Sequence, residues 1–225
     1  VTGNMKFDGT ATTDADTTDA RALLREIDVP DEEPVLVAGS TFEGEEELLC
    51  KLLPQWRKEH PGLFLVLVPR HFERASAVLE NLKPLNLRIR RRTAMNAGAE
   101  KPDVLLVDTT GELRAFYEVA TLVFMGKSLT AQGGQNPIEP AALGRPMVFG
   151  PFMQNFKPVV KSLLEAKAAM QVKDETELAE QVSVLLGNLE QRAALGTAAR
   201  AVVEGNRGAT QRTAELIGQT LRALG

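Results

Sequence analysis

The sequence predicts an α/β fold in which helices cover both faces of a parallel, Rossmann-like sheet. Short runs rich in Val, Leu and Phe alternate with longer segments of helical periodicity, as in repeated βαβ units. The short runs are apolar almost throughout, which indicates strands buried on both faces. The chain has 225 residues, of which 44% are hydrophobic and 25% charged. This composition is sufficient for one large domain with a sizeable core.

The apolar runs define six main strands, and the segment AAMQV is a candidate for a last one. The strands are predicted at 34–39, 63–69, 87–92, 103–108, 121–126 and 146–150. Helices are predicted between them at 44–58, 73–82, 112–119, 137–143 and 156–166. After the last strand the pattern becomes almost wholly helical, so we expect a helical C-terminal layer. Before the first strand, a polar stretch caps a short helix.

Charge and cysteine content exclude several functional classes. The net charge is −4 and the pI is near 5.4, so the bulk charge does not favour nucleic acid. The dense basic run at 88–92 is interpreted as a solvated strand edge or tight turn. A single cysteine, Cys50, forms no disulfide framework, and with only two histidines beside it a Cys/His zinc site is not available.

The chain shows neither a membrane-spanning run nor a secretory signal. No apolar run approaches the roughly 18 to 20 residues that a transmembrane helix needs. The first residues, VTGNMKFDGT, lack the basic and apolar regions of a signal peptide. They read like the middle of a longer sequence. We therefore expect a fragment or single domain of a larger protein, and expect the fragment itself to be soluble.

Two motifs that superficially indicate ligand binding have a simpler interpretation. In GSTFEGEE (39–46), Glu45 stands where a phosphate-binding P-loop requires lysine, and the dinucleotide fingerprint G-x-G-x-x-G is missing as well. We expect Ser40 and Thr41 to be N-caps there, with Glu43, Glu45 and Glu46 complementing the helix dipole. In DADTTD (14–19), the D-x-D lies before a helix rather than after a strand, which favours helix capping over metal binding.

Two strand ends carry residues suited to an anionic ligand. Arg70 directly follows a buried strand, at the edge where open α/β sheets bind ligands, and its guanidinium fits a phosphate or a base edge. The alternative is a surface ion pair with Glu73. Thr110 and Gly111 follow another strand and can aim backbone N–H groups at an anion. Glu112 beside them is alternatively a partner of the helix dipole only.

A third strand end, GGQNPIEPAALG (133–144), combines a flexible loop with a helix start. Gly133 and Gly134 allow a close approach of the backbone to a ligand. Asn136 is a good N-cap, and Pro137 fixes the φ angle of the first turn. Glu139 then lies just inside the helix, where its carboxylate can accept hydrogen bonds from sugar hydroxyls. The alternative is a helix cap without a ligand.

Six motifs together resemble the C-terminal half of 3-deoxy-D-manno-octulosonic acid (Kdo) transferases. They are VTGNMKFD, GSTFEGEEE, LVLVPRHFER, LLVDTTGELRAFY, GGQNPIEPAALGRPMVFGP and NFK. The resemblance implies one half of a GT-B glycosyltransferase, with residues 1–225 forming the CMP-Kdo-binding domain. It also implies transfer of Kdo from CMP-Kdo to a lipid A precursor in lipopolysaccharide biosynthesis. The acceptor domain, with a catalytic Glu and a membrane-associating segment, is expected outside this chain, at the cytoplasmic face of the inner membrane.

The resemblance also implies roles for individual residues. Lys6, in the pattern G-x-x-K-F-D, is assigned to stabilising the transition state. The CMP moiety is held by Pro69, Arg70, Thr110, Gly111, Glu112, Asn136, Pro137, Ile138 and Glu139. No cofactor or metal is expected, since a nucleoside monophosphate leaving group carries less charge than a diphosphate.

The sequence departs from the family pattern at four positions. Phe42 and Gln135 stand where members usually have histidine, so no histidine role is transferred. Phe72 stands where proline is common, and Lys127 replaces a usual glycine. Two alternatives remain open. One is a GT-B transferase that uses a UDP- or GDP-sugar, and the other, which Phe42 and Gln135 keep open, is a non-catalytic binding or scaffolding domain.

Overall fold

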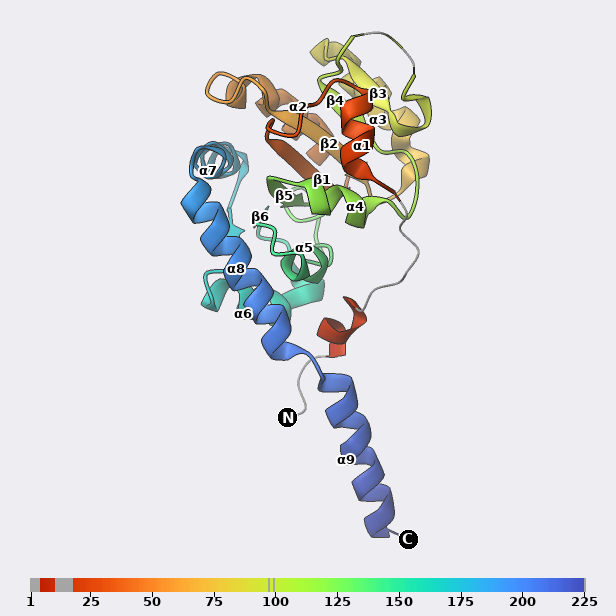
Figure 1. Ribbon diagram of the computed structural model, residues 1–225, viewed down its shortest axis with the longest axis vertical. Coiled ribbons are helices and arrows are strands. Elements are labelled where there is room, and N and C mark those ends of the chain that lie inside the picture. The colour runs from red at the N-terminus through yellow and green to blue at the C-terminus, as the bar shows by residue number, and fades with distance from the viewer. Residues whose placement is uncertain (1–4, 11–17, 97, 99, 225) are drawn as a thin grey trace.

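The computed structural model describes residues 5–10, 18–96, 98 and 100–224, and it contains one parallel sheet (Figure 1). The sheet has seven strands in the order β3-β4-β2-β1-β5-β6-β7, and every pair is parallel. The strands are β1 Val35–Thr41, β2 Phe64–Pro69, β3 Ile89–Arg91, β4 Val104–Leu106, β5 Leu122–Met125, β6 Met147–Phe149 and β7 Met170–Gln171. The predicted Rossmann-like fold is confirmed, including the short last strand.

Helices cover both faces of the sheet, as predicted. They are α1 Ala20–Glu26, α2 Glu45–Trp56, α3 Ala75–Leu82, α4 Leu113–Val119, α5 Ile138–Ala142, α6 Lys157–Glu165, α7 Glu175–Gly187, α8 Leu189–Asn206 and α9 Ala209–Leu224. Alternate residues of each strand point to opposite faces and build two hydrophobic clusters. One cluster joins the sheet to α1, α4, α5, α6 and α8, and the other joins it to α2, α3 and α7. The strands are therefore buried on both sides.

The chain order reverses direction across the middle of the sheet, between β1 and β5. Strands β2 and β4 lie on one side of β1, and β5 and β6 lie on the other. Crevices at such switch points, beyond the carboxyl ends of the strands, are where open α/β sheets bind ligands. The strand ends approach closely here, because a Cβ on Gly126 would lie 2.3 Å from the carbonyl oxygen of Ser40. We call this side of the sheet the carboxyl edge.

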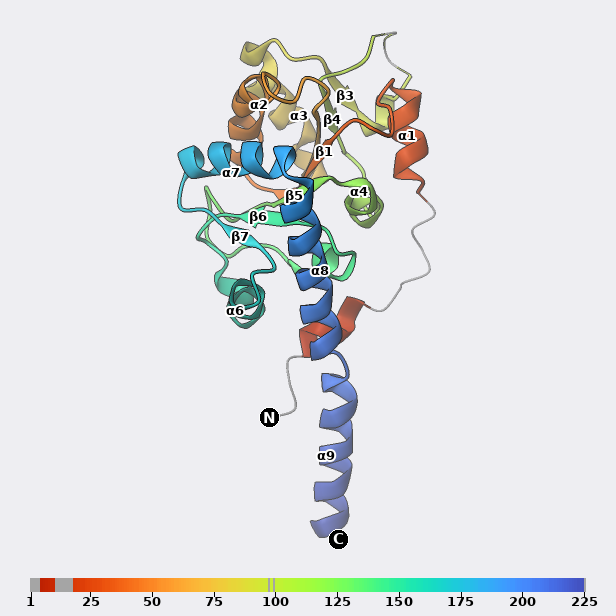
Figure 2. The same cartoon turned by 60° about the vertical axis from the view of Figure 1, so that its left-hand side comes forward.

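The C-terminal helices form a layer only in part. Helix α7 packs on α2, and α8 crosses α5, α6 and α7. Helix α9 instead extends away from the body of the domain (Figures 1 and 2) and contacts the short 3-10 helix η1, Met5–Thr10. The Asp8 carboxylate links the two segments by accepting hydrogen bonds from the backbone N–H groups of Gly208 (2.7 Å) and Thr210 (2.6 Å). None of the described helices has the length and apolar character of a membrane span.

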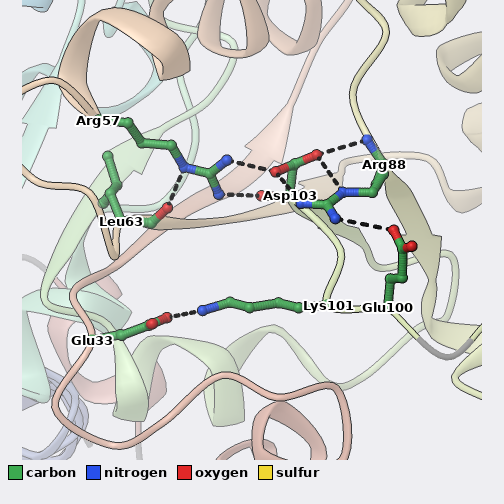
Figure 3. Close-up of polar contacts among 7 residues, drawn as sticks. All are labelled: Glu33, Arg57, Leu63, Arg88, Glu100, Lys101 and Asp103. Atoms are coloured by element: carbon green, nitrogen blue, oxygen red, sulfur yellow. Dashed lines mark hydrogen bonds and ion pairs between the residues drawn. The ribbon is translucent and has the colours of Figure 1, made fainter.

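The amino edge of the sheet, where the strands begin, carries a network of ion pairs (Figure 3). Arg57 donates from Nη1 to Asp103 Oδ1 at 2.7 Å and from Nε to the carbonyl of Leu63 at 2.8 Å. Arg88 donates to the same carboxylate from Nε (3.2 Å), and Lys101 pairs with Glu33. These contacts join residues before β1, β2, β3 and β4.

The basic run at 88–92 forms edge strand β3 and the turn after it, as predicted, but it is less solvated than expected. Arg90 is only 9% exposed, and its guanidinium donates to the carbonyls of Met95 (2.6 Å) and Glu100 (3.0 Å). Arg91 pairs with Asp108 at 2.7 Å. The arginines of this run therefore bind carbonyl and carboxylate groups of the protein itself.

Candidate nucleotide-binding site

Arg70 and the loop after β4 line one hollow at the carboxyl edge. The hollow has a volume of about 120 Å³. It is lined by Ser40, Val68, Pro69, Arg70, Phe72, Thr109, Thr110, Gly111 and Leu113. Gly111 has φ +86°, and the space beside its Cα is open, since an added Cβ would meet nothing within 4 Å. Two predicted strand ends therefore meet in one place.

The guanidinium of Arg70 is exposed and lies within ion-pair distance of no described carboxylate. The alternative pairing with Glu73 is not formed. The backbone holds the residue in place, because Arg70 N donates to the carbonyl of Thr41 at 3.0 Å. Its side chain is thus anchored at the base and available at its charged end.

The helix start at 136–139 lies within electrostatic range of Arg70. The N-cap of α5 is Pro137, one residue after the predicted Asn136, but the Asn136 side chain still accepts a hydrogen bond from Ile138 N at 3.1 Å. Glu139 is the second residue of this helix. Burial raises the pKa of the Glu139 carboxyl, while Arg114, a hydrogen bond from Asn136 and Arg70 act in the opposite direction. Glu139 does not line the 120 Å³ hollow itself, but its charge and that of Arg70 interact.

The side chains of three residues of the predicted site are hydrogen-bonded within the protein or buried in it. The Glu112 carboxylate accepts hydrogen bonds from Arg92 Nε (3.0 Å) and from the hydroxyl of Thr109. The side chains of Pro137 and Ile138 are buried. Such residues shape the loops, and their side chains are not available to a ligand.

The glycines at 133 and 134 have a structural reason that differs from the predicted one. Both have positive φ angles, +121° and +73°. A Cβ on Gly133 would lie 2.9 Å from Asn155 Nδ2, and one on Gly134 would lie 2.5 Å from Met153 Sδ. The close approach that excludes a side chain is therefore that of the 152–155 loop. A ligand is not needed to explain these glycines.

Lys6 is brought to the same loop from the start of the chain. Its Nζ donates to the carbonyl of Asn155 at 2.9 Å and lies 4.7 Å from the centroid of the Phe156 ring. Asn155 N in turn donates to the carbonyl of Gly133 at 2.9 Å. The ammonium group of Lys6 thus lies next to the loop that leads into Asn136 and Glu139.

The predicted N-caps Ser40 and Thr41 are wrong. Helix α2 starts after Gly44, which has φ +87° and provides no side-chain cap. Ser40 has φ +54° and lines the hollow, and the hydroxyl of Thr41 donates to Glu46 at 2.9 Å. Strand β1 runs on to Thr41, which pairs with Pro69 of β2, so these residues belong to the strand, while helix α2 begins at Glu45, next to the predicted residue 44.

Glu45 has a role that sequence reasoning missed. Its carboxylate is fully buried and accepts backbone hydrogen bonds from Phe42 (2.9 Å), Lys127 (2.7 Å), Ser128 (2.9 Å) and Leu129 (3.1 Å). Burial raises the pKa of this carboxyl, and the four N–H groups oppose the effect. Glu45 therefore fastens the loop after β5 to the loop after β1. No local signal reveals this, since three partners are more than 80 residues away in sequence.

Asp19 is the residue of the DADTTD segment that caps α1, by accepting a hydrogen bond from Ala22 N at 2.9 Å. Asp14 and Asp16 lie outside the described residues. Within the described ranges, no three His, Cys, Asp or Glu side chains are grouped as ligands of a metal ion.

The fold defines the class, because it is the Rossmann-like fold of one half of a GT-B glycosyltransferase. The carboxyl edge of such a sheet, at its switch point, is where open α/β sheets bind ligands. The solved structure of WaaG, a glycosyltransferase involved in lipopolysaccharide biosynthesis, matches with a TM-score of 0.60 at 11% identity, over 92% of this chain and 52% of that chain. At this identity the likeness concerns the fold alone.

The particular relatives are Kdo transferases. The 3-deoxy-D-manno-octulosonic acid transferase of Haemophilus influenzae is 35% identical over 223 residues, which cover 96% of this chain and 50% of that protein. The C-terminal CMP-Kdo binding domain of WaaA from Acinetobacter baumannii matches with a TM-score of 0.74 at 29% identity, over 82% of this chain and 95% of that domain. No family model matches the chain.

The resemblance to Kdo transferases is thus confirmed, and the chain is a homologue of these proteins over most of its own length. The chain spans about half the length of the Kdo transferases that it matches, 50% in one case and 44% in another.

Proposed function

We propose that the chain is the donor-nucleotide-binding domain of a glycosyltransferase that moves Kdo from CMP-Kdo to a lipid A precursor in lipopolysaccharide biosynthesis. The observation that carries the proposal is the meeting of Arg70 and Gly111 in one hollow at the carboxyl edge, with Glu139 within electrostatic range. The homology to Kdo transferases supports the choice of donor.

The hollow fits part of a nucleotide. Its volume of about 120 Å³ lies below the roughly 300–1,000 Å³ of typical small-molecule pockets. We assign the phosphate to this hollow, where the Arg70 guanidinium and the backbone N–H groups at Thr110, Gly111 and Glu112 offer donors. Pro69 fixes the backbone that carries Arg70.

The second part of the nucleotide is assigned to the helix start. The carboxylate of Glu139 accepts hydrogen bonds from ribose hydroxyls, and the amide of Asn136 is placed beside it. Pro137 and Ile138 contribute indirectly, by setting the direction of the first turn. Gln135 still offers hydrogen bonds here, although it cannot carry the charge of a histidine at neutral pH.

The chemistry follows from the charges at this edge. An acceptor hydroxyl, deprotonated by a base outside this chain, attacks the anomeric carbon of Kdo. The bond between that carbon and the phosphate oxygen breaks, and CMP leaves with the bonding electrons, which inverts the configuration. Negative charge grows on the departing phosphate, so cationic groups placed there beforehand lower the barrier. Arg70 is the first such group, and Lys6, beside the Gly133 loop, is the second.

The acceptor and the membrane belong to the rest of the proposed enzyme. We assign the lipid A precursor, the catalytic base and the contact with the membrane surface to a second domain, at the cytoplasmic face of the inner membrane. The chain alone is then expected to bind CMP weakly and to transfer nothing. Joining it to the acceptor domain should produce transfer.

Isothermal titration with CMP, UDP and GDP tests the proposal. We expect saturable heat with CMP in the range of micromolar to millimolar dissociation constants, and weaker binding of UDP and GDP. The absence of saturable heat at millimolar CMP contradicts the proposal. Preferential binding of UDP or GDP would instead favour a transferase with another donor class.

A further inference from the structure

Lys127 places a second ammonium group at the carboxyl edge. It follows β5 and has φ +53°, a backbone conformation that a non-glycine residue adopts only when its surroundings impose it. The buried carboxylate of Glu45 imposes it here, by accepting hydrogen bonds from Lys127 N (2.7 Å) and from the two residues after it. The base of the side chain is therefore held rigidly.

Phe42 orients the other end of the same side chain. The Nζ atom of Lys127 lies 5.0 Å from the centroid of the Phe42 ring, within the range of a cation–π contact. The guanidinium of Arg74 also lies 5.6 Å from this centroid, but it is neutralised by Glu46 at 3.0 Å. Lys127 has no ion pair with any described carboxylate. Of the two cations on this ring, it is the one whose charge remains for a ligand.

Lys127 and Lys6 are far apart in sequence but both lie beside the loop at Gly133. A Cβ on Gly133 would lie 3.5 Å from Lys127 Cε and 2.9 Å from Asn155 Nδ2. Lys6 Nζ donates to the carbonyl of that same Asn155. Both lysines thus lie beside the loop at Gly133, on the side of the sheet to which the sugar donor is assigned. The loop leads directly into Asn136 and Glu139.

We propose that Lys127 binds the anionic group of the sugar donor, either its phosphate or the carboxylate of the sugar acid, and that Phe42 and Glu45 are positioning residues for it. The inference rests on the proposed function and adds a specificity-determining residue to the same site. It also gives a role to Phe42, which stands at a usual histidine position but can neither carry a charge nor form a hydrogen bond through its side chain. The Phe42 ring instead orients Lys127, and Lys127 supplies the positive charge.

Titration of three ligands against variants of Lys127 tests the inference. The ligands are cytidine, CMP and CMP-Kdo, which add the phosphate and then the carboxylate stepwise. We expect Lys127→Met to weaken CMP or CMP-Kdo about five- to tenfold, the range for one charge-assisted hydrogen bond, and to leave cytidine unchanged. Lys127→Arg should retain most of the affinity. Phe42→Leu should weaken the same ligand by less, and it should add little in the Lys127→Met background.

Lys58→Met is the matched control, because Lys58 is an exposed lysine just after the opposite end of α2. It should leave all three affinities unchanged. Raising the salt concentration should reduce the difference in ligand affinity between wild type and Lys127→Met, because the interaction that the variant loses is electrostatic. A merely structural role for Lys127 would change the unfolding temperature instead, without this dependence on salt and ligand.

Weaker CMP binding assigns Lys127 to the phosphate, and weaker binding of CMP-Kdo alone assigns it to the carboxylate. Unchanged affinity for both ligands, with CMP still bound by the wild-type protein, overturns the inference and leaves the proposed function standing. A wild-type protein that binds neither ligand overturns both.

Discussion

At the amino edge of the sheet, charged side chains satisfy one another, whereas at the carboxyl edge Arg70 and Lys127 face no described carboxylate within ion-pair distance. Asp103 accepts from both Arg57 and Arg88, and Lys101 pairs with Glu33 (Figure 3). The contrast separates two uses of charge. Paired charges at the amino edge hold the strands in place. At the carboxyl edge, which has ion pairs such as Arg91–Asp108 as well, Arg70 and Lys127 remain for an anionic ligand.

Removing Asp103 should have the largest effect on stability. Its side chain is 14% exposed and neutralises Arg57, which is 23% exposed. Asp103→Ala leaves Arg57 with no described carboxylate partner, while Arg88 keeps Glu100, so we expect a loss of about 2 kcal/mol in the free energy of unfolding. Urea denaturation measures it. Glu100→Gln, which removes a carboxylate that is 79% exposed, should cost less than about 0.5 kcal/mol. Weakened CMP binding in Asp103→Ala, once corrected for unfolding, would break the comparison.

Removing Arg70 should show the opposite behaviour. The guanidinium is exposed and forms no ion pair with a described residue, so Arg70→Ala should change the free energy of unfolding by less than about 0.5 kcal/mol. It should nevertheless weaken CMP binding about tenfold, which corresponds to about 1.4 kcal/mol. Titration calorimetry on wild type and variant measures the ratio. Wild-type affinity in Arg70→Ala would mean that the phosphate binds elsewhere.

The ion pairs of the amino edge should also affect how the free energy of unfolding falls at acid pH. Burial alone would raise the pKa of Asp103, but hydrogen bonds from Arg88 and Arg57 outweigh it and lower the pKa from 3.8 to about 2. A lowered pKa in the folded state stabilises the protein above pH 3.8, and this contribution is lost as pH falls from about 4 to about 2. Wild type should therefore lose more stability than Asp103→Asn across this window, as measured by urea denaturation at each pH. Parallel curves would show that the network does not depend on the charge.

Glu139→Gln should have a small effect on stability, and one of opposite sign to that of Asp103→Ala. Burial raises the pKa of Glu139, so its ionisation destabilises the folded state as pH rises through that value. The neutral amide should raise the unfolding free energy at pH 7 by about 0.5 kcal/mol, while CMP binding weakens. Thermal unfolding with and without CMP measures both quantities. A variant that is less stable and binds CMP normally would contradict a ligand-binding role for this carboxylate.

Local patterns predicted the sheet and the helices well, because burial on both faces gives each strand an unbroken apolar run and each helix a distinct period. The cap at Asp19 was predicted as well, since a cap depends on residues two or three positions away. Contacts between distant segments were not predictable in this way. The hydrogen bonds from the loop after β5 to the Glu45 carboxylate and the burial of Arg90 both depend on such contacts.

In the candidate site, too, local features were predictable from the sequence and contacts between distant segments were not. Arg70, Thr110 and Gly111 were identifiable because each directly follows a strand, and parallel strands bring their ends to one edge. The structural reason for Gly133 and Gly134 was not identifiable, because the 152–155 loop that they contact folds back from beyond β6. Nor did the sequence show that Lys127 and Phe42 lie together, since 85 positions separate them and only the pairing of β1 with β5 makes them neighbours.

A crystal structure of the chain grown with CMP tests most directly whether the carboxyl edge holds a nucleotide. We expect the phosphate within hydrogen-bond distance of Arg70 and of the backbone at Gly111, with the ribose towards Glu139. A second cavity of about 370 Å³ lies between α6 and the 151–154 loop and is lined by Met153, Lys157 and Leu164 among others. A nucleotide bound there instead, or no bound nucleotide at saturating CMP, would contradict the assignment.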